Sequence, residues 1–431
     1  MRPYHPYTPD QAFLLPVDLR EVISPADPVH VVRRAVEQFD LGAIHAKLRS
    51  VRGRPPFHPK AIAALLLYGA CRGIYASRRL QWACRHDVSF MYLMGGVKPD
   101  FHTICEFRKR FEAELKDLFS QVLQMCQAAG LVRLGHVSLD GTKVRANASK
   151  HKAMSYERLL ARRKAYEEEI ESWFARAEHE DAEDDEEHGG DDDGFSLPEG
   201  WFETLKRLAK VEAAQAMLEE QAQEKVMRAG KPREAARVHP RAQANFTDPE
   251  SRIMHTPNGF QQCYNAQAAV DAESQVIVAR EVSQAPPDVQ RLRPMLAQIV
   301  ELTGRSPQEL SADAGYASEG NFTALEEADV YAVVALRRYH RDEPADADPA
   351  PARSSNRWPH RNEMRERLST PEGKEKYKLR KQTVEPVFGQ IKEARNFRQF
   401  LRRGLDAVSA EWSLVCTAHN LLKLGQAWQM R

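Results

Sequence analysis

Strand-like and helical segments alternate after residue 135, and this alternation limits the possible folds most strongly. "GHVSLDGTKVRAN" predicts a strand, a glycine turn and a second strand, while "CYNAQAAVD" and "QVIVAREV" predict a hairpin. Two helical segments follow, "DVQRLRPMLAQIVEL" and "SEGNFTALEEA", and each precedes a short strand, "ELSAD" or "VYAVVAL". The order β-β-β-β-α-β-α-β-α predicts a mixed α/β sheet flanked by helices rather than a Rossmann fold.

A long charged segment interrupts this order. Residues 155–178 and 201–229 have helical composition, and the acidic, glycine-rich residues 178–200 separate them. We therefore expect residues 155–240 to form an antiparallel helical hairpin with a disordered acidic loop. The sheet domain would then comprise residues 133–154 and 241–400, with a loop over 337–370, and residues 401–431 would form a C-terminal helix.

The segment before the sheet is predicted to be helical. Residues 1–55 are expected to be irregular apart from a helix near Pro28–Phe39, and residues 56–132 to form a helical DNA-binding region. Its second helix, "SRRLQWACRHDVSFMYLM", is basic, and its third is long, with a capping box at Thr103 and Glu106 and an end at Gly130. A plain helical bundle without DNA binding remains the alternative.

The formal net charge of +1 averages over unlike parts. Residues 178–193 hold 11 of the 61 acidic residues, so the rest of the chain has 50 acidic residues against 62 basic ones. This basic body favours a polyanionic partner. The six cysteines form no C-x-x-C pair, and no leader or membrane-spanning run is apparent, which predicts a soluble cytoplasmic protein without a zinc site or a membrane partner.

Three acidic residues are candidates for one site. Asp140 and Asp313 each close a predicted strand, and ligand sites form at the carboxyl ends of strands in open α/β sheets. Glu385 lies on a predicted helix whose Val384, Val387, Phe388 and Ile391 form an apolar side. Divalent ions would remove the repulsion between three such carboxylates, and oxygen-only ligands favour Mg²⁺ or Mn²⁺. The alternative is that the aspartates cap turns and that Glu385 pairs with Lys381.

Several motifs resemble bacterial insertion-sequence transposases that have an RNase H-like catalytic domain and a DDE triad. "SLDGTKVRANAS" is similar to the motif with the first Asp, "YNAQAAVD" and "SADAGYAS" to the middle segments, and "YKLRKQTVEPVFGQIKEARNFRQFLRRG" to the Glu motif with its Glu-x6-Lys spacing. "PDFHTICEFRKRF" is similar to the upstream helical segment. The resemblance covers about residues 55–425, although Lys381 stands where an arginine often precedes the Glu.

The resemblance implies an RNase H-like fold and a transposase that cleaves DNA at the element's terminal inverted repeats and joins the 3′-OH ends to target DNA. Asp140, Asp313 and Glu385 would be the catalytic residues and the ligands of Mg²⁺ or Mn²⁺, with two ions expected. The protein would act as a homodimer on double-stranded DNA, associated with the nucleoid. Seven basic residues are predicted to contact phosphates: Lys378, Arg380, Lys381, Lys392, Arg395, Arg402 and Arg403. The first four of these stand in the same helical segment as Glu385.

On a helical wheel Lys378, Lys381, Glu385 and Lys392 lie close to one line, which predicts a single face toward metal and DNA. Pro386 lacks an N–H, so the helix is expected to begin near Thr383 or to kink there. Two other functions remain possible from the sequence. One is a nuclease of the same fold without strand transfer, and the other is a catalytically dead, transposase-derived DNA-binding protein.

Overall fold

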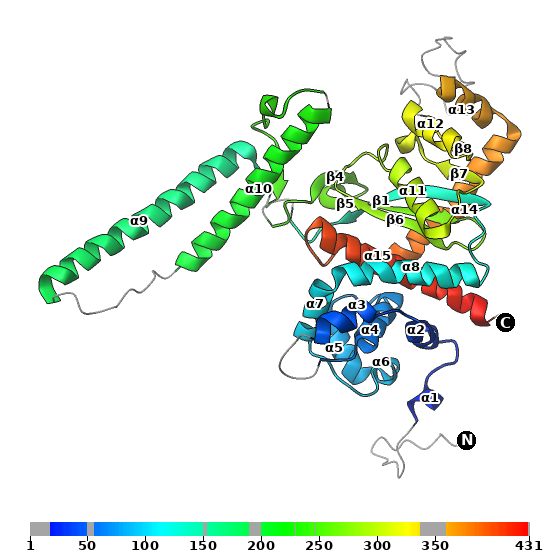
Figure 1. The fold of residues 1–431 in the computed structure, drawn as a ribbon, viewed down its shortest axis with the longest axis horizontal. Coiled ribbons are helices and arrows are strands. Elements are labelled where there is room, and N and C mark those ends of the chain that lie inside the picture. The colour runs from blue at the N-terminus through cyan, green and yellow to red at the C-terminus, as the bar shows by residue number, and fades with distance from the viewer. Residues whose placement is uncertain are drawn as a thin grey trace, which may run out of the picture.

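The computed structural model describes residues 18–49, 56–149, 153–188, 200–228, 230–245, 247–336 and 359–429. Three parts can be followed in Figure 1: an N-terminal group of helices, a sheet flanked by helices, and a long helical hairpin that extends away from both. Within the described residues, no helix is both long and apolar enough to cross a membrane.

The N-terminal part is helical from residue 19 onward. The helix predicted near Pro28–Phe39 is confirmed as α2 (Pro28–Glu37), but the expectation of an irregular segment is wrong where α1 (Leu19–Val22) and α3 (Gly42–Arg49) form. Its helix α2 packs on α4, which is buried along most of its length. Residues 1–17 and 50–55 lie outside the described residues. The helices are α1 (Leu19–Val22), α2 (Pro28–Glu37), α3 (Gly42–Arg49), α4 (Pro59–Cys71), α5 (Ser77–His86), α6 (Val88–Leu93), α7 (Phe101–Arg110) and α8 (Glu112–Ala128).

Two helices that were predicted to be continuous are broken. The basic helix divides into α5 and α6 because the Asp87 side chain caps a new start, accepting from the backbone N–H groups of Ser89 and Phe90. The long third helix divides into α7 and α8 at Phe111, and Asp100, rather than Thr103, caps its first part. Gly130 ends α8 with φ +75°, as predicted.

The sheet has the strand order β4-β5-β1-β7-β8, and β6 also pairs with β5. The β1–β5 and β5–β6 pairs are antiparallel, whereas β1–β7 and β7–β8 are parallel. This arrangement confirms the predicted RNase H-like mixed sheet. The strands are β1 (His136–Arg145), β4 (Arg252–Thr256), β5 (Gly259–Asp271), β6 (Ile277–Ser283), β7 (Glu309–Ala312) and β8 (Tyr331–Val334).

The predicted glycine turn after Asp140 is wrong, because β1 runs unbroken through Gly141 and pairs there with Gln267 of β5. A Cβ at Gly141 would lie 2.3 Å from Nε2 of Gln267 and 2.7 Å from Oδ1 of Asp288. The glycine therefore allows close approach instead of a turn. The strand β4, which pairs with the start of β5, was not predicted.

Helices on both sides of the sheet complete the fold. The last helix, α15, packs on β6 and also on α8 and α4, so it joins the sheet to the N-terminal helices in one continuous apolar core. Residues 359–369 form a helix although the sequence predicted a loop over 337–370; residues 337–358 lie outside the described residues. The elements are α11 (Leu292–Thr303), the 3₁₀ turn η3 (Ala314–Tyr316), α12 (Glu319–Glu327), α13 (Pro359–Ser369), α14 (Pro371–Gly389), the π-helical turn η4 (Gln390–Ala394) and α15 (Leu405–Gln429).

The charged insertion forms a hairpin of two long helices, α9 (Tyr156–His188) and α10 (Trp201–Arg228), which pack on each other. The first helix continues to His188, so residues 178–188 are helical and not a loop; residues 189–199 lie outside the described residues. A 3₁₀ turn, η2 (Arg233–Ala235), follows the hairpin. A two-stranded sheet, β2 (Ala153–Ser155) with β3 (Gln243–Asn245), closes its base next to a small separate core.

Candidate active site

Asp140 and Asp313 lie on neighbouring central strands at the same level of the sheet. The last paired residues of β1 and β7 are Leu139 and Ala312, and each aspartate follows directly. Asp140 continues along β1, where it lies opposite Ala268 of β5, while Asp313 leaves β7 and caps η3 through a hydrogen bond from the Gly315 N–H, 2.8 Å. The strand register therefore brings the two carboxyl groups to one edge of the sheet.

Glu385 reaches this edge from α14, which packs across β1, β5, β7 and β8. Val384, Val387 and Phe388 are buried beneath the helix, whereas the Glu385 side chain is 49% exposed. Pro386 lies within α14, so the helix does not begin near Thr383. The apolar side fixes the helix to the sheet and leaves Glu385 on the open side.

Arg380 connects two of the three acids. Its Nη1 donates to Oδ2 of Asp140, 2.7 Å, and its Nη2 lies 3.6 Å from Oε1 of Glu385. A single guanidinium thus contacts both carboxylates, and its side chain is only 14% exposed. The basic partner of the acids is Arg380, five residues before Glu385, rather than Lys381, which is exposed.

The electrostatics of Asp140 show how crowded the site is with negative charge. The pKa of Asp140 is raised to about 6: burial is the largest cause, and the nearby Asp313 and Asp288 add to it, against the opposing effects of Arg380 and the Gly141 N–H. The ionised carboxylate of Asp140 therefore has too little positive charge around it to offset its burial and the neighbouring acids. The donor atoms are carboxylate oxygens, the ligand type that suits Mg²⁺ and Mn²⁺, so these residues fit the ions that the sequence predicted.

Asp288 was missed by the sequence reasoning because it follows no strand directly. It stands in the loop after β6, in the sequence "APPDV". Its Oδ1 accepts from Nδ2 of Asn265, 2.6 Å, and from Nε2 of Gln267, 2.7 Å. The signal that could have revealed it is the pair of amides at alternate positions of β5, both fully buried beside the strand that carries Asp140.

The seven basic residues predicted to contact DNA are not equivalent in the structure. Arg395 is 5% exposed and bonds to Nδ1 of His419 in the core, and the Arg402 side chain is only 16% exposed, pairing with Glu112. These two side chains are engaged inside the protein and do not form part of an open basic surface. Lys378, Lys381 and Arg403 are exposed.

Lys392 does not continue the face of α14 as the helical wheel predicted. The α-helix ends at Gly389 and a π-helical turn follows, so the spacing of 100° per residue no longer applies. Lys392 instead donates to Oγ1 of Thr142 and to the backbone oxygen of Lys143, both on β1. It therefore lies beside the strand that carries Asp140, not in line with Lys378 and Lys381.

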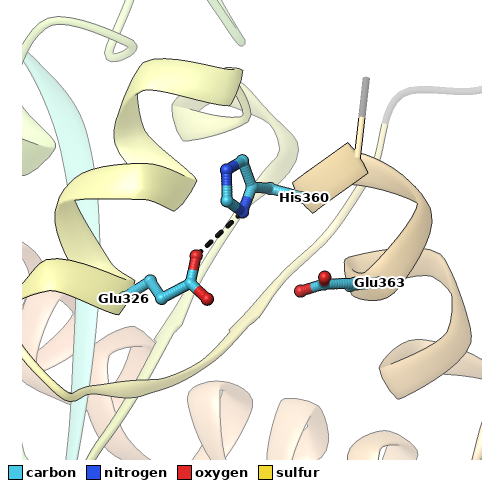
Figure 2. A group of neighbouring side chains, drawn as sticks. All are labelled: Glu326, His360 and Glu363. Atoms are coloured by element: carbon cyan, nitrogen blue, oxygen red, sulfur yellow. Dashed lines mark ion pairs between the residues drawn. The ribbon is translucent and has the colours of Figure 1, made fainter. Parts of the chain in front are cut away.

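A second group of donor side chains lies apart from these acids, between α12 and α13. Figure 2 shows Glu326, His360 and Glu363, whose donor atoms all lie within 4.8 Å of one another. Nδ1 of His360 forms an ion pair with Glu326, 2.9 Å, and both glutamates are exposed. The ion pair joins α13 to α12, which accounts for the arrangement as a structural contact.

The strand order and the three acids at one sheet edge define an RNase H-like protein with a candidate DDE site. Residues 226–421 match the family described as the transposase DDE domain, and residues 17–110 match a second family, the transposase domain DUF772. Together the two matches indicate an insertion-sequence DDE transposase. No curated protein and no solved structure gives a significant match. Asp140 lies in neither matched segment, and only the pairing of β1 with β5 and β7 brings it to Asp313.

Proposed function

We propose that this transposase binds the terminal inverted repeats of its element, cleaves phosphodiester bonds there and joins the released 3′-OH ends to target DNA. The observation that carries the proposal is the meeting of Asp140, Asp313 and Glu385 at one edge of an RNase H-like sheet. Asp140, Asp313 and Glu385 would hold Mg²⁺ or Mn²⁺, and we expect two ions. When bound, such ions supply positive charge for the attacking and leaving oxygens of a phosphodiester.

The protein's own groups would position the DNA strand. Lys378 and Lys381 are exposed on α14, the helix that carries Glu385, and lysine binds phosphate as a point charge. Arg380 contacts Asp140 and Glu385, and Lys392 holds β1 at Thr142. A phosphate held by the two lysines would therefore lie beside the acids. These contacts go to the backbone, so they would not read sequence.

The helix α5 is our candidate for contact with the terminal repeats. It carries no acidic residue, its Leu80 and Ala83 are buried, and its outer face presents Arg78, Arg79, Trp82, Arg85 and His86. Trp82 is 60% exposed and stacks on His86 with ring centroids 4.4 Å apart. A basic helix with an exposed face suits insertion into a DNA groove.

A homodimer on double-stranded DNA would explain the hairpin of α9 and α10. Phe174 and Phe202 are large apolar side chains that the hairpin leaves exposed, and both lie next to Trp201, Phe174 with its ring centroid 5.0 Å from that of Trp201 and Phe202 as the following residue. Exposed apolar side chains on an element that extends from the body are typical of a contact with another subunit. We assign this contact to a second copy of the chain, acting on chromosomal DNA in the cytoplasm.

The test compares cleavage with binding. We expect Asp140→Asn, Asp313→Asn and Glu385→Gln each to abolish Mg²⁺-dependent nicking of a terminal-repeat duplex while leaving binding to that duplex largely intact. If a variant nicks within about tenfold of wild type, the residue that it replaces is not a catalytic ligand. If the wild-type protein binds the duplex but never nicks it, the protein is a catalytically dead DNA-binding protein. If it nicks the duplex but does not transfer strands, it is a nuclease.

A further inference from the structure

Asp288 is built into the candidate active site by contacts with two strands. Its Oδ1 accepts from Asn265 and Gln267 of β5 and lies 3.4 Å from Nζ of Lys143 of β1. Its Oδ2 accepts no hydrogen bond from any residue that the structure describes. One oxygen is therefore fixed by three donors, while the other is left for a ligand.

The loop that carries Asp288 is fixed by its neighbours. The backbone oxygens of Ala285, Pro286 and Val289 accept from Asn265, Lys143 and Asn321, at 3.1, 2.8 and 2.7 Å. Two consecutive prolines, at 286 and 287, restrict the backbone directly before the aspartate. The position of the carboxylate is consequently set before any ligand binds.

Two glycines leave space on either side of this carboxylate. A Cβ at Gly315 would lie 2.9 Å from Oδ1 of Asp313 and 3.2 Å from Oδ2 of Asp288, so the same small space faces both acids. A Cβ at Gly141, next to Asp140, would lie 2.7 Å from Oδ1 of Asp288. Asp288 therefore lies close to both strand-end acids of the triad, and its Oδ2 faces the gap next to Asp313.

A purely structural role would not require a charge at this position. A neutral side-chain oxygen could accept from Asn265 and Gln267 without the cost of partly burying a third carboxylate among like charges. Lys143 and Arg380 are the cations in direct contact with the aspartates in the described part of the site. The acids therefore outnumber the cations around Oδ2 of Asp288, the oxygen that accepts no hydrogen bond from the described residues.

We propose that Asp288 is a fourth carboxylate ligand of the catalytic divalent cation, which it contacts through Oδ2 on the side of Asp313. This inference rests on the proposed function, because the cation is the one that Asp140, Asp313 and Glu385 would hold. Asn265 and Gln267 are then positioning residues, which orient Asp288 through Oδ1.

The experiment measures Mn²⁺ binding to the full-length, metal-free protein from the electron paramagnetic resonance signal of the free ion. Asp288→Asn keeps an oxygen for Asn265 and Gln267 but removes the charge. We expect it to raise the Kd for Mn²⁺ at least tenfold, since even groups that only orient metal ligands change affinity by about 10–100-fold. Asp329→Asn is the matched control: it removes one exposed charge from the same domain at φ +54°, which asparagine tolerates.

The outcomes separate this inference from the proposed function. If Asp288→Asn has the wild-type Kd for Mn²⁺ while Asp140→Asn has a raised Kd, the role of Asp288 alone is overturned. Wild-type affinity in both variants would remove the metal site of the proposed function as well. If Asp288→Asn does not fold, Gly315→Ala provides the test, because its methyl group would fill the space between Asp313 and Asp288; unchanged Mn²⁺ affinity in that variant would refute the proposal.

Discussion

Replacing Gly141 by alanine should destabilise the protein, although the backbone there accepts alanine. Gly141 has no positive φ, and at such a position Gly→Ala normally stabilises a protein by about 0.4–1 kcal/mol through the unfolded state. Here the new methyl group would lie 2.3 Å from Nε2 of Gln267 and 2.7 Å from Oδ1 of Asp288. Neither group can withdraw easily, because the two are hydrogen-bonded to each other at 2.7 Å.

The magnitude follows from two destabilising effects and one smaller stabilising effect. Overpacking a filled site costs about 1–3 kcal/mol. Displacing Gln267 from a charged acceptor costs about 1.5–3 kcal/mol more if the bond is lost, while the unfolded-state gain offsets less than 1 kcal/mol. We expect a net loss of about 2 kcal/mol. At about 2–4 °C per kcal/mol for domains of 150–250 residues, Tm should fall by about 4–8 °C.

Thermal unfolding of the full-length chain, followed by circular dichroism, measures this change. Gly389→Ala is the matched control, because Gly389 has helical angles, φ −59° and ψ −48°, and a Cβ there would meet no atom within 4 Å. The control should gain about 0.5–1 kcal/mol. If Gly141→Ala melts at or above the temperature of wild type, Gln267 and Asp288 are not packed against β1 as described, and the reasoning about the site fails.

Three further predictions concern other parts of the chain. Lys381→Ala should flatten the slope of log K against log[salt] by about 0.9 on terminal-repeat and random duplexes alike, and a loss confined to the terminal repeat would make Lys381 a reader of sequence. Deleting residues 178–200 should leave folding and nicking intact, because in the described part of the chain the small core at the hairpin base is formed by Leu159, Val211, Ala214, Leu218 and Ala244; loss of soluble protein would contradict this. His419 should contribute to acid unfolding. Burial, with Arg395 nearby, lowers the pKa of His419 to about 3, so the unfolded chain takes up the proton first as the pH falls. The stability due to neutral His419 is then complete above about pH 6.5 and is lost toward pH 3, at up to about 1.4 kcal/mol per unit. Urea unfolding at pH 7 and pH 5 should show a smaller difference for His419→Gln than for wild type, and equal differences would exclude this role.

The acids of the candidate site could be predicted because each has a local signal. Asp140 and Asp313 end apolar strand segments, and parallel neighbours such as β1 and β7 bring their carboxyl ends to one edge. Glu385 stands on the open side of a helix whose buried side is apolar. The mixed sheet was likewise predictable from the order of strand and helix patterns.

The basic residues were harder to assign, because a positive charge in the sequence does not reveal what covers it. Arg395 follows a π-helical turn that ends the regular spacing of α14, and its side chain enters the core beside His419. Arg402 meets Glu112, a residue 290 positions earlier in the chain. Such long-range partners depend on how α15 and α8 pack, which a local pattern cannot show.

Gln267 shows that the geometry of the site depends on parts of the fold that carry none of its acids. Its side-chain oxygen accepts from the Tyr316 hydroxyl, its Nε2 donates to Asp288, and its backbone oxygen accepts from Nε1 of Trp412 on α15. These contacts connect the turn after β7, the loop after β6 and the C-terminal helix at one strand position. A glycine at the paired position of β1, Gly141, gives that side chain its room. The strand pair β1–β5 therefore orients the Asp288 carboxylate near Asp140, and a change at Gln267 should displace Asp288 without replacing any of the acids.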